Sequence, residues 1–244
     1  MVSSRRSSRG RATTRLHPPE RPPPSGIEWL LRRLRPDREA ALRQYQWRAP
    51  AYDFQLMFAR PARELAVTRL GLKRGDTVID VGCGTGLSFP LLEERIGPHG
   101  RIIGIEQSPE MIGQARDRTK EHGWHNVTLV LSPAEEADIH VAADAALFCF
   151  THDIMRMPKA LDNIFRHLKP GARVVATGLK WAPGWNLPAN LMVLYGGLAS
   201  TTSLEGLRQP WSYLADRVSA FKVEQLFTRT VYLATGIAHR PPHH

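Results

Sequence analysis

The chain has 244 residues, a hydrophobic share of 42% and a formal net charge of +10. This length suits one α/β domain with an irregular extension, and the apolar share is enough to form a core. No apolar run approaches the roughly 20 residues of a membrane-spanning helix, and no apolar segment follows the N-terminal arginines, so neither a span nor a signal peptide is expected.

The first 70 residues are predicted as a tail followed by a lid. Residues 1–26 hold six arginines and one glutamate with almost no large apolar side chains, which predicts a disordered Arg/Pro-rich tail. Its charge either solubilises the protein or attracts an anionic lipid or nucleic-acid surface. Residues 27–70 are predicted as an N-terminal helical lid segment, with helices over 27–35, 37–47 and 62–70.

The chain is organised around the stretch from Thr77 to Ser88. A short β-branched run ends abruptly in glycines at positions 82, 84 and 86, and a helical pattern follows over 87–96. This order predicts a buried strand, a tight turn and a helix. Such a turn at the carboxyl end of a parallel sheet is where open α/β folds bind nucleotides.

Two acidic residues indicate which nucleotide is bound. The glycines depart from the dinucleotide spacing, and Asp80 would repel a pyrophosphate but attract an ammonium or a sulfonium group. Glu106 ends a second predicted strand 24 residues after Gly82, where a ribose-binding carboxylate belongs. S-adenosylmethionine fits this pattern, because it combines an adenosine and a cationic sulfur with no phosphate.

Three segments, VIDVGCGTG, GIEQSPEMIGQAR and HLKPGARVVATG, resemble the class I S-adenosylmethionine-dependent methyltransferase family. The resemblance spans about residues 45–240. It implies an α/β fold, a Rossmann-like seven-stranded mostly parallel sheet with one antiparallel strand and helices on both faces. The methyltransferase core is placed at 71–240, and the alternatives are another Rossmann-type nucleotide binder or a degenerate, inactive copy.

The resemblance also implies a set of cofactor-binding residues. These are Tyr52, Asp80, Gly82, Cys83, Gly84, Gly86, Glu106, Gln107, Met111, Ser132, Pro133, Ala134, Cys149 and Phe150. Many relatives carry an acid at the position of Ser132, where it bonds the adenine amino group. Here the Ser132 hydroxyl or the backbone of Ala134 takes that role. Tyr52 either lies over the cofactor as part of the lid or simply packs its helix onto the core.

The rest of the core alternates strands and helices, which predicts a parallel sheet covered on both faces. Further strands are expected at 127–131, 144–150 and 173–177, with helices at 109–123 and 158–167. Residues 168–171 are predicted as a turn into the fifth strand. An apolar, proline-broken insert at 181–200, a helix at 204–214 and a closing hairpin of 221–227 with 230–238 complete the chain.

The reaction needs positioning more than acid–base help, since the sulfonium already activates the methyl carbon. His152, just past the fourth strand, is the candidate general base, with Asp153 to orient it, and Tyr52 is a further catalytic candidate. The alternative is that His152 is a surface or helix-cap histidine, because many methyltransferases need no base.

The acceptor is predicted to be a small molecule that is hydrophobic or bears an amine. Residues assigned to its binding are His152, Trp181, Trp185, Met192 and Tyr195. The layout is similar to that of enzymes that methylate lipid head groups or quinones, so the alternative partner is an anionic membrane surface. The other hypotheses are a nucleic-acid methyltransferase, against which the absence of a base-flipping motif argues, and a non-catalytic S-adenosylmethionine-binding protein.

The two cysteines, Cys83 and Cys149, bear on the compartment and on metal binding. They suit reduced thiols in a cytoplasmic protein better than a disulfide. No His/Cys/Asp cluster has metal-ligand spacing, so no metal is predicted. The protein is therefore expected in the cytoplasm, with peripheral membrane association as the variant that the lipid hypothesis implies.

Overall fold

The computed structural model describes residues 59–200 and 204–239, with side chains omitted for 196–200. The predicted tail, the helices at 27–35 and 37–47, and Tyr52 lie outside the described residues. The elements are α3 (Arg60–Leu70), β1 (Thr77–Val81), α4 (Phe89–Ile96), β2 (Arg101–Glu106), α5 (Pro109–Glu121), β3 (Val127–Leu131), β4 (Ala143–Cys149), α6 (His152–Met155), α7 (Pro158–Arg166), β5 (Leu168–Leu179), α8 (Leu187–Ser200), α9 (Ser212–Ala215), β6 (Val218–Leu226) and β7 (Val231–Ala238).

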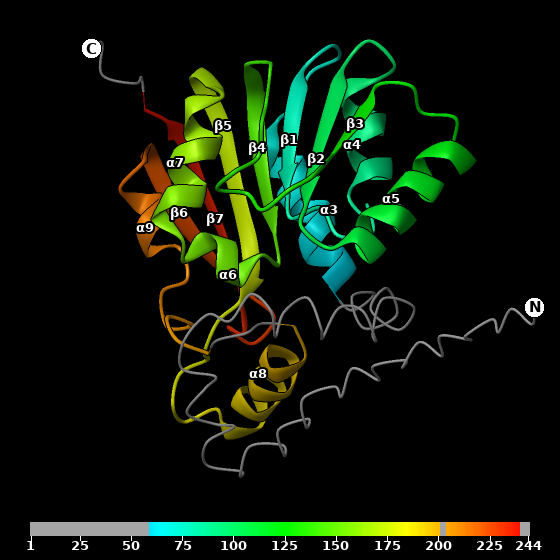
Figure 1. Cartoon of the computed structure of the whole chain (residues 1–244). Coiled ribbons are helices and arrows are strands. Elements are labelled where there is room, and N and C mark those ends of the chain that lie inside the picture. Colours follow the sequence, from blue (N-terminus) through cyan, green and yellow to red (C-terminus); the bar gives the residue numbers. More distant parts are fainter. Residues whose placement is uncertain (1–58, 201–203, 240–244) are drawn as a thin grey trace, which may run out of the picture.

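The strands form one seven-stranded sheet in the order β3-β2-β1-β4-β5-β7-β6 (Figure 1). β1 pairs in parallel with β2 on one side and with β4 on the other. β7 lies antiparallel between β5 and β6. The predicted fold class is therefore confirmed. Because the chain winds outward in both directions from β1 and β4, their carboxyl ends form the switch point at which such sheets bind ligands.

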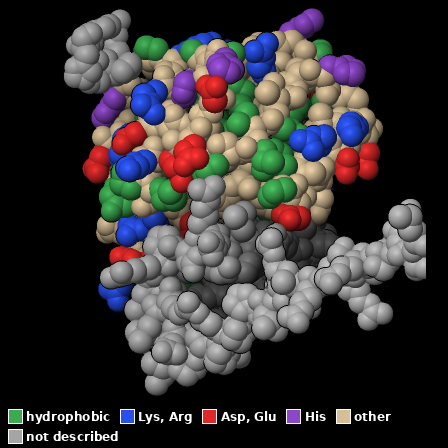
Figure 2. Space-filling model, viewed as in Figure 1, with side chains coloured by type: hydrophobic (Ala, Val, Ile, Leu, Met, Phe, Trp, Pro, Cys, Tyr) green, Lys and Arg blue, Asp and Glu red, His purple; other side chains and the backbone are tan. Residues whose placement is uncertain are grey.

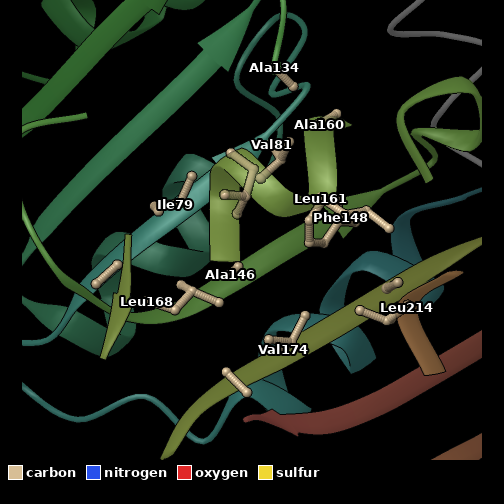
Figure 3. Packing of buried hydrophobic residues seen from close by; sticks show 14 of the residues in the cluster. Ile79, Val81, Ala134, Ala146, Phe148, Ala160, Leu161, Leu168, Val174 and Leu214 are labelled. Carbon is tan, nitrogen blue, oxygen red and sulfur yellow. The ribbon is translucent and has the colours of Figure 1, made fainter. Parts of the chain in front are cut away.

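Helices cover both faces of the sheet, and each face has its own apolar layer. One layer packs α6, α7 and α9 against side chains such as Ile79, Phe148 and Val174 (Figure 3). The other packs α3, α4 and α5 against Val78, Leu147 and their neighbours. Successive strand residues point to opposite faces, so a near-continuous apolar run serves both layers.

Most predicted elements form where the sequence placed them. β1, β2 and β3 have the predicted bounds, and α3, α4, α5 and α7 differ by at most two residues at each end. α3, grouped with the lid by sequence, packs against β4, β5 and β7 in the body of the domain. β4 ends at Cys149, one residue before the prediction, because Phe150 has a left-handed φ of +59° that a strand cannot continue.

Two predictions after α7 were wrong in detail. Residues 168–171, expected to form a turn, belong to β5, where Leu168 pairs with Ala143 before the register shifts. The helix expected at 204–214 is replaced by turns and the four-residue α9. Gly206 has a left-handed φ of +77°, and Pro210 lacks the N–H that a helix would need.

The apolar insert at 181–200 is mostly helical, since α8 begins at Leu187 and runs to its end. Its prolines do not break α8, because Pro188 lies in the first turn, where its missing N–H costs nothing. Figure 1 shows α8 below the carboxyl edge of the sheet, on the same side as the ends of β4 and β5. Among the described helices, none combines the length and the apolar character that crossing a membrane requires.

Candidate active site

A left-handed glycine turn joins β1 to α4 at the carboxyl edge. Gly82, Gly84 and Gly86 have φ angles of +68°, +56° and +78°, a region that side chains with a Cβ rarely adopt. A Cβ on Gly82 would lie 2.6 Å from Thr151 Cγ2, just after β4. A Cβ on Gly84 would meet Met111 Sδ at an ordinary 3.8 Å. The turn is thus packed tightly at its first glycine and loosely at its second.

Glu106, the last residue of β2, is held beside this turn by backbone donors. The Ser108 N–H donates to Oε1 at 2.8 Å, and the Gly84 N–H donates to Oε2 at 3.1 Å. Burial raises the pKa of this carboxyl group, while the backbone N–H groups of Ser108, Gly84 and Gln107 oppose that rise. Each oxygen keeps a further lone pair, so the carboxylate can still accept bonds from a ligand.

Asp80 lies on β1, two residues before the turn, and its side chain is almost fully buried. Ser88 hydrogen-bonds its carboxyl group, but Oδ2 has no hydrogen-bond partner among the described residues. Burial raises its pKa to about 7, although the charge of Arg63 lowers it. A buried carboxylate oxygen without a partner is costly, which is typical of a group that awaits a ligand donor.

Arg63 is a site residue that the sequence reasoning missed. It lies on α3, is buried, and places its charge beside Asp80 and a hydrogen bond on the thiol of Cys149. Burial raises the pKa of Cys149 to about 11, so the thiol stays protonated. The sequence did carry a signal that Arg63 is buried, because it shares the helical spacing of the buried Ala66, Val67 and Leu70. An arginine on a core-facing stripe needs a buried partner.

The backbone after β4 is strained and brings polar side chains toward the glycine turn. Phe150 keeps its left-handed φ while its N–H donates to Thr177 O at 2.8 Å. Thr151 Oγ1 and His152 Nδ1 are buried and have no hydrogen-bond partner within the part of the chain that the structure describes. Left-handed conformations of bulky residues cost about 1–3 kcal/mol and cluster at functional sites.

His152 is oriented by a backbone carbonyl. Its Nε2 lies 2.9 Å from Glu205 O, which can only accept, so Nε2 carries the proton and Nδ1 the lone pair. Burial lowers the pKa of His152, and the charge of Asp153 opposes that change. Asp153, predicted as the orienter, thus acts on the ring through its charge, while the ring donates its hydrogen bond to the Glu205 carbonyl.

The residues predicted to contact adenine follow β3 beside Glu106. The Ser132 N–H donates to Glu106 O at 3.0 Å, and the Ser132 hydroxyl donates to Pro133 O at 3.0 Å. Ala134 is buried, and its carbonyl accepts a bond from Asn163 Nδ2 at 2.9 Å. These bonds place the loop near the ribose-binding candidate, while the adenine contacts themselves stay a prediction.

The residues predicted to bind the acceptor are spread along the insert. Trp181 is half-buried, and its N–H donates to Leu207 O at 2.9 Å. Trp185, Met192 and Tyr195 are 79%, 76% and 74% exposed. His152, the fifth residue of the set, is buried. The described residues therefore do not gather these side chains into one closed pocket.

The fold and the residues at the carboxyl edge of the sheet define a class of protein. A sheet of this order, with a glycine turn after β1 and a carboxylate ending β2, is the Rossmann-like fold of class I S-adenosylmethionine-dependent methyltransferases. Residues 72–190 match a family described as a methyltransferase domain. Over this stretch the chain therefore carries a methyltransferase domain with the class I fold. Within the described residues, no group of three His, Cys, Asp or Glu side chains is arranged to hold a metal ion.

Individual relatives share this domain with differing acceptors. The chain is 36% identical over 129 residues to a trans-aconitate 2-methyltransferase of Azoarcus sp., and this match covers 50% of this chain and 48% of that protein. It is 32% identical over 116 residues to a protein-L-isoaspartate O-methyltransferase of Ignicoccus hospitalis, and this match covers 48% of this chain and 53% of that protein. The chain thus spans about half the length of these curated relatives.

A solved structure extends the likeness of fold. The N-methyltransferase NodS of Bradyrhizobium japonicum, in complex with S-adenosyl-L-homocysteine, has a TM-score of 0.54 and 19% identity. The match covers 74% of this chain and 87% of NodS. At this identity the likeness concerns the fold, and the acceptor has to be argued from the residues of this chain.

Proposed function

We propose that the protein transfers the methyl group of S-adenosylmethionine to a small acceptor that is hydrophobic or bears an amine. The observation that carries this proposal is the pair of buried carboxylates around the glycine turn. Asp80 leaves Oδ2 without a partner among the described residues, and Glu106 is fixed against the Gly84 N–H. Two acids at an open glycine suit a ligand that is cationic and carries ribose hydroxyls.

The residues of the edge fit this cofactor in distinct roles. Glu106 accepts hydrogen bonds from the ribose hydroxyls, since its oxygens keep lone pairs beyond those used by Gly84 and Ser108. Asp80 attracts the positive charge of the methionyl end. Gly84 leaves room where a side chain would project. When bound, the cofactor supplies a methyl group attached to a sulfonium. The methyl group passes to the lone pair of the acceptor, and the electrons of the broken C–S bond stay on sulfur.

His152 serves as the general base where the acceptor has to lose a proton. Its Nε2–H is committed to Glu205 O, so Nδ1 is the atom that takes the proton. Because burial lowers the pKa of His152, the ring is neutral at neutral pH and ready to accept. Thr151, whose buried hydroxyl also lacks a partner among the described residues, can align the acceptor beside it.

A second candidate acceptor is a lipid head group, and one observation favours it. Leu187, Leu191, Met192 and Tyr195 are exposed along α8, below the carboxyl edge of the sheet (Figure 1). A bilayer would cover such a surface and bring its head groups toward this edge.

Binding and turnover test the proposal separately. Calorimetric titration should give binding of S-adenosylmethionine and S-adenosylhomocysteine but not of NAD, which carries a pyrophosphate. Release of S-adenosylhomocysteine should then be measured with amines, carboxylic acids, quinols and phosphatidylethanolamine vesicles. Tight binding without turnover of any acceptor would favour the non-catalytic alternative. Absence of binding would refute the proposal outright.

A further inference from the structure

The outer face of α8 is an exposed apolar stripe. Leu187, Leu191 and Tyr195 follow one another at four-residue intervals and are 67%, 67% and 74% exposed, with Met192 beside them. Ala189 and Val193 on the opposite side are buried. The helix therefore has one apolar side against the domain and a second apolar side turned outward.

Such a surface is unusual in this molecule. The other large apolar side chains that are exposed among the described residues are Leu131, Trp185 and Phe227. Trp185 lies two residues before the start of α8. On the part of the molecule that Figure 2 draws in colour, hydrophobic side chains stand in small groups among Lys, Arg, Asp and Glu. A contiguous apolar stripe of this kind marks an interaction surface, whereas single exposed apolar residues do not.

Charge distinguishes the possible occupants of this stripe. The sequence from Trp181 to Ser203 has no Asp, Glu, Lys or Arg. The segment before Ala59 is rich in arginine and would find no counter-charge on α8. A second copy would bring another net charge of +10. An anionic lipid surface instead offers acyl chains to the stripe and phosphates to the arginines.

The neighbouring turn supports the same partner. Phe227 and Arg229 lie in the turn between β6 and β7, and both are exposed. The Lys180 ammonium donates to Arg229 O at 3.2 Å and to Trp181 O at 2.6 Å, which ties this turn to the start of the insert. An apolar ring and a guanidinium thus extend from the same end of the sheet as α8.

We propose that the outer face of α8 docks on an anionic membrane surface. The helix lies in the interface with Leu187, Leu191, Met192 and Tyr195 in the acyl boundary, and Arg229 in the neighbouring turn contacts the head groups. This orientation turns the carboxyl edge of the sheet toward the bilayer. The inference goes beyond the proposed reaction, because docking does not require any particular acceptor.

Vesicle sedimentation with the full chain tests the docking. The protein should bind phosphatidylcholine vesicles that contain phosphatidylglycerol, bind pure phosphatidylcholine weakly, and release as salt is raised. A double variant, Leu187→Glu with Leu191→Glu, should lose about tenfold or more in vesicle affinity. Leu131→Glu, the same change at an exposed position on β3, should keep the wild-type affinity and serves as the matched control.

Several outcomes would overturn the docking. These are no binding of the wild type, equal binding of the double variant, or a double variant that loses a dimer seen by sedimentation. A large fall in the unfolding temperature of the double variant would likewise show that a chain segment covers the stripe. Calorimetry with S-adenosylmethionine separates the two proposals, since the double variant should bind the cofactor as the wild type does.

Discussion

Replacing Asp80 with Asn should stabilise the ligand-free protein at neutral pH and weaken its binding of S-adenosylmethionine. Asp80 is 1% exposed, and burial raises its pKa from 3.8 to about 7 even with Arg63 nearby. One pKa unit corresponds to ~1.4 kcal/mol, so ionising this group in the folded protein costs roughly 4 kcal/mol more than in the unfolded chain.

The sign follows from which state holds the proton. Between pH 3.8 and about 7 the folded protein keeps Asp80 protonated while the unfolded chain releases the proton. The free energy of unfolding therefore falls as the pH rises through this window, and the loss is complete above it. Asn cannot ionise and avoids the loss. The variant should gain roughly 4 kcal/mol at about pH 8 and roughly 2 kcal/mol at about pH 5.

Urea unfolding of both proteins at these two pH values measures the difference. Asp117→Asn is the control, because its side chain is 70% exposed on α5 and should change stability little at either pH. Adding S-adenosylmethionine at a hundred times its dissociation constant should stabilise the wild type by ~2.7 kcal/mol and the Asp80 variant by much less. A variant less stable than the wild type at about pH 8 would refute the reasoning, since Arg63 would then hold Asp80 ionised.

Four further substitutions test the site. Glu106→Gln should lower affinity for S-adenosylmethionine about tenfold or more, because an amide N–H₂ replaces one ribose acceptor, and calorimetry giving wild-type affinity would exclude that role. Gly82→Ala should lower the free energy of unfolding in urea by at least about 2 kcal/mol, because of its left-handed φ and the clash with Thr151. Gly84→Ala should lower it by about 1–2 kcal/mol but abolish binding of S-adenosylmethionine. Equal stability losses with intact binding would show that the glycine turn does not hold the cofactor. His152→Asn should slow turnover about 100-fold while leaving the affinity for the cofactor unchanged. It should also remove the acidic limb of the pH–rate profile, which lies below pH 6.5 because the pKa of His152 is lowered. If the variant keeps this limb, His152 is not the general base.

Local patterns were enough to predict the centre of this protein. The glycine turn and the acids at positions 80 and 106 stand in a strand–turn–helix order that is legible over some thirty residues. The strands before and after the turn formed with the predicted bounds, since β-branched runs punctuated by glycine or proline carry their own boundaries. The antiparallel hairpin at the end followed from alternation in the same way.

Long-range contacts decided what the patterns left open. Glu205 O orients His152 from 53 residues away, and no sequence rule pairs a ring nitrogen with a distant carbonyl. Gly206 and Pro210 prevent a continuous helix over 204–214, although the sequence pattern there is helical. The sequence also could not predict that α8 is exposed, because an apolar helix has the same sequence pattern whether its outer side is covered or exposed.

The sequence by itself determined the class of fold and the glycine turn with its two nearby acids, because both depend on residue types at short spacings along one strand–turn–helix unit. Only the tertiary structure decided that Arg63 lies beside Asp80, that Phe150 ends β4 in a left-handed conformation, and that α8 turns a second apolar face outward. The physical reason is that charge pairing, backbone strain and exposure depend on neighbours brought together by the sheet, and these neighbours are far apart in the chain.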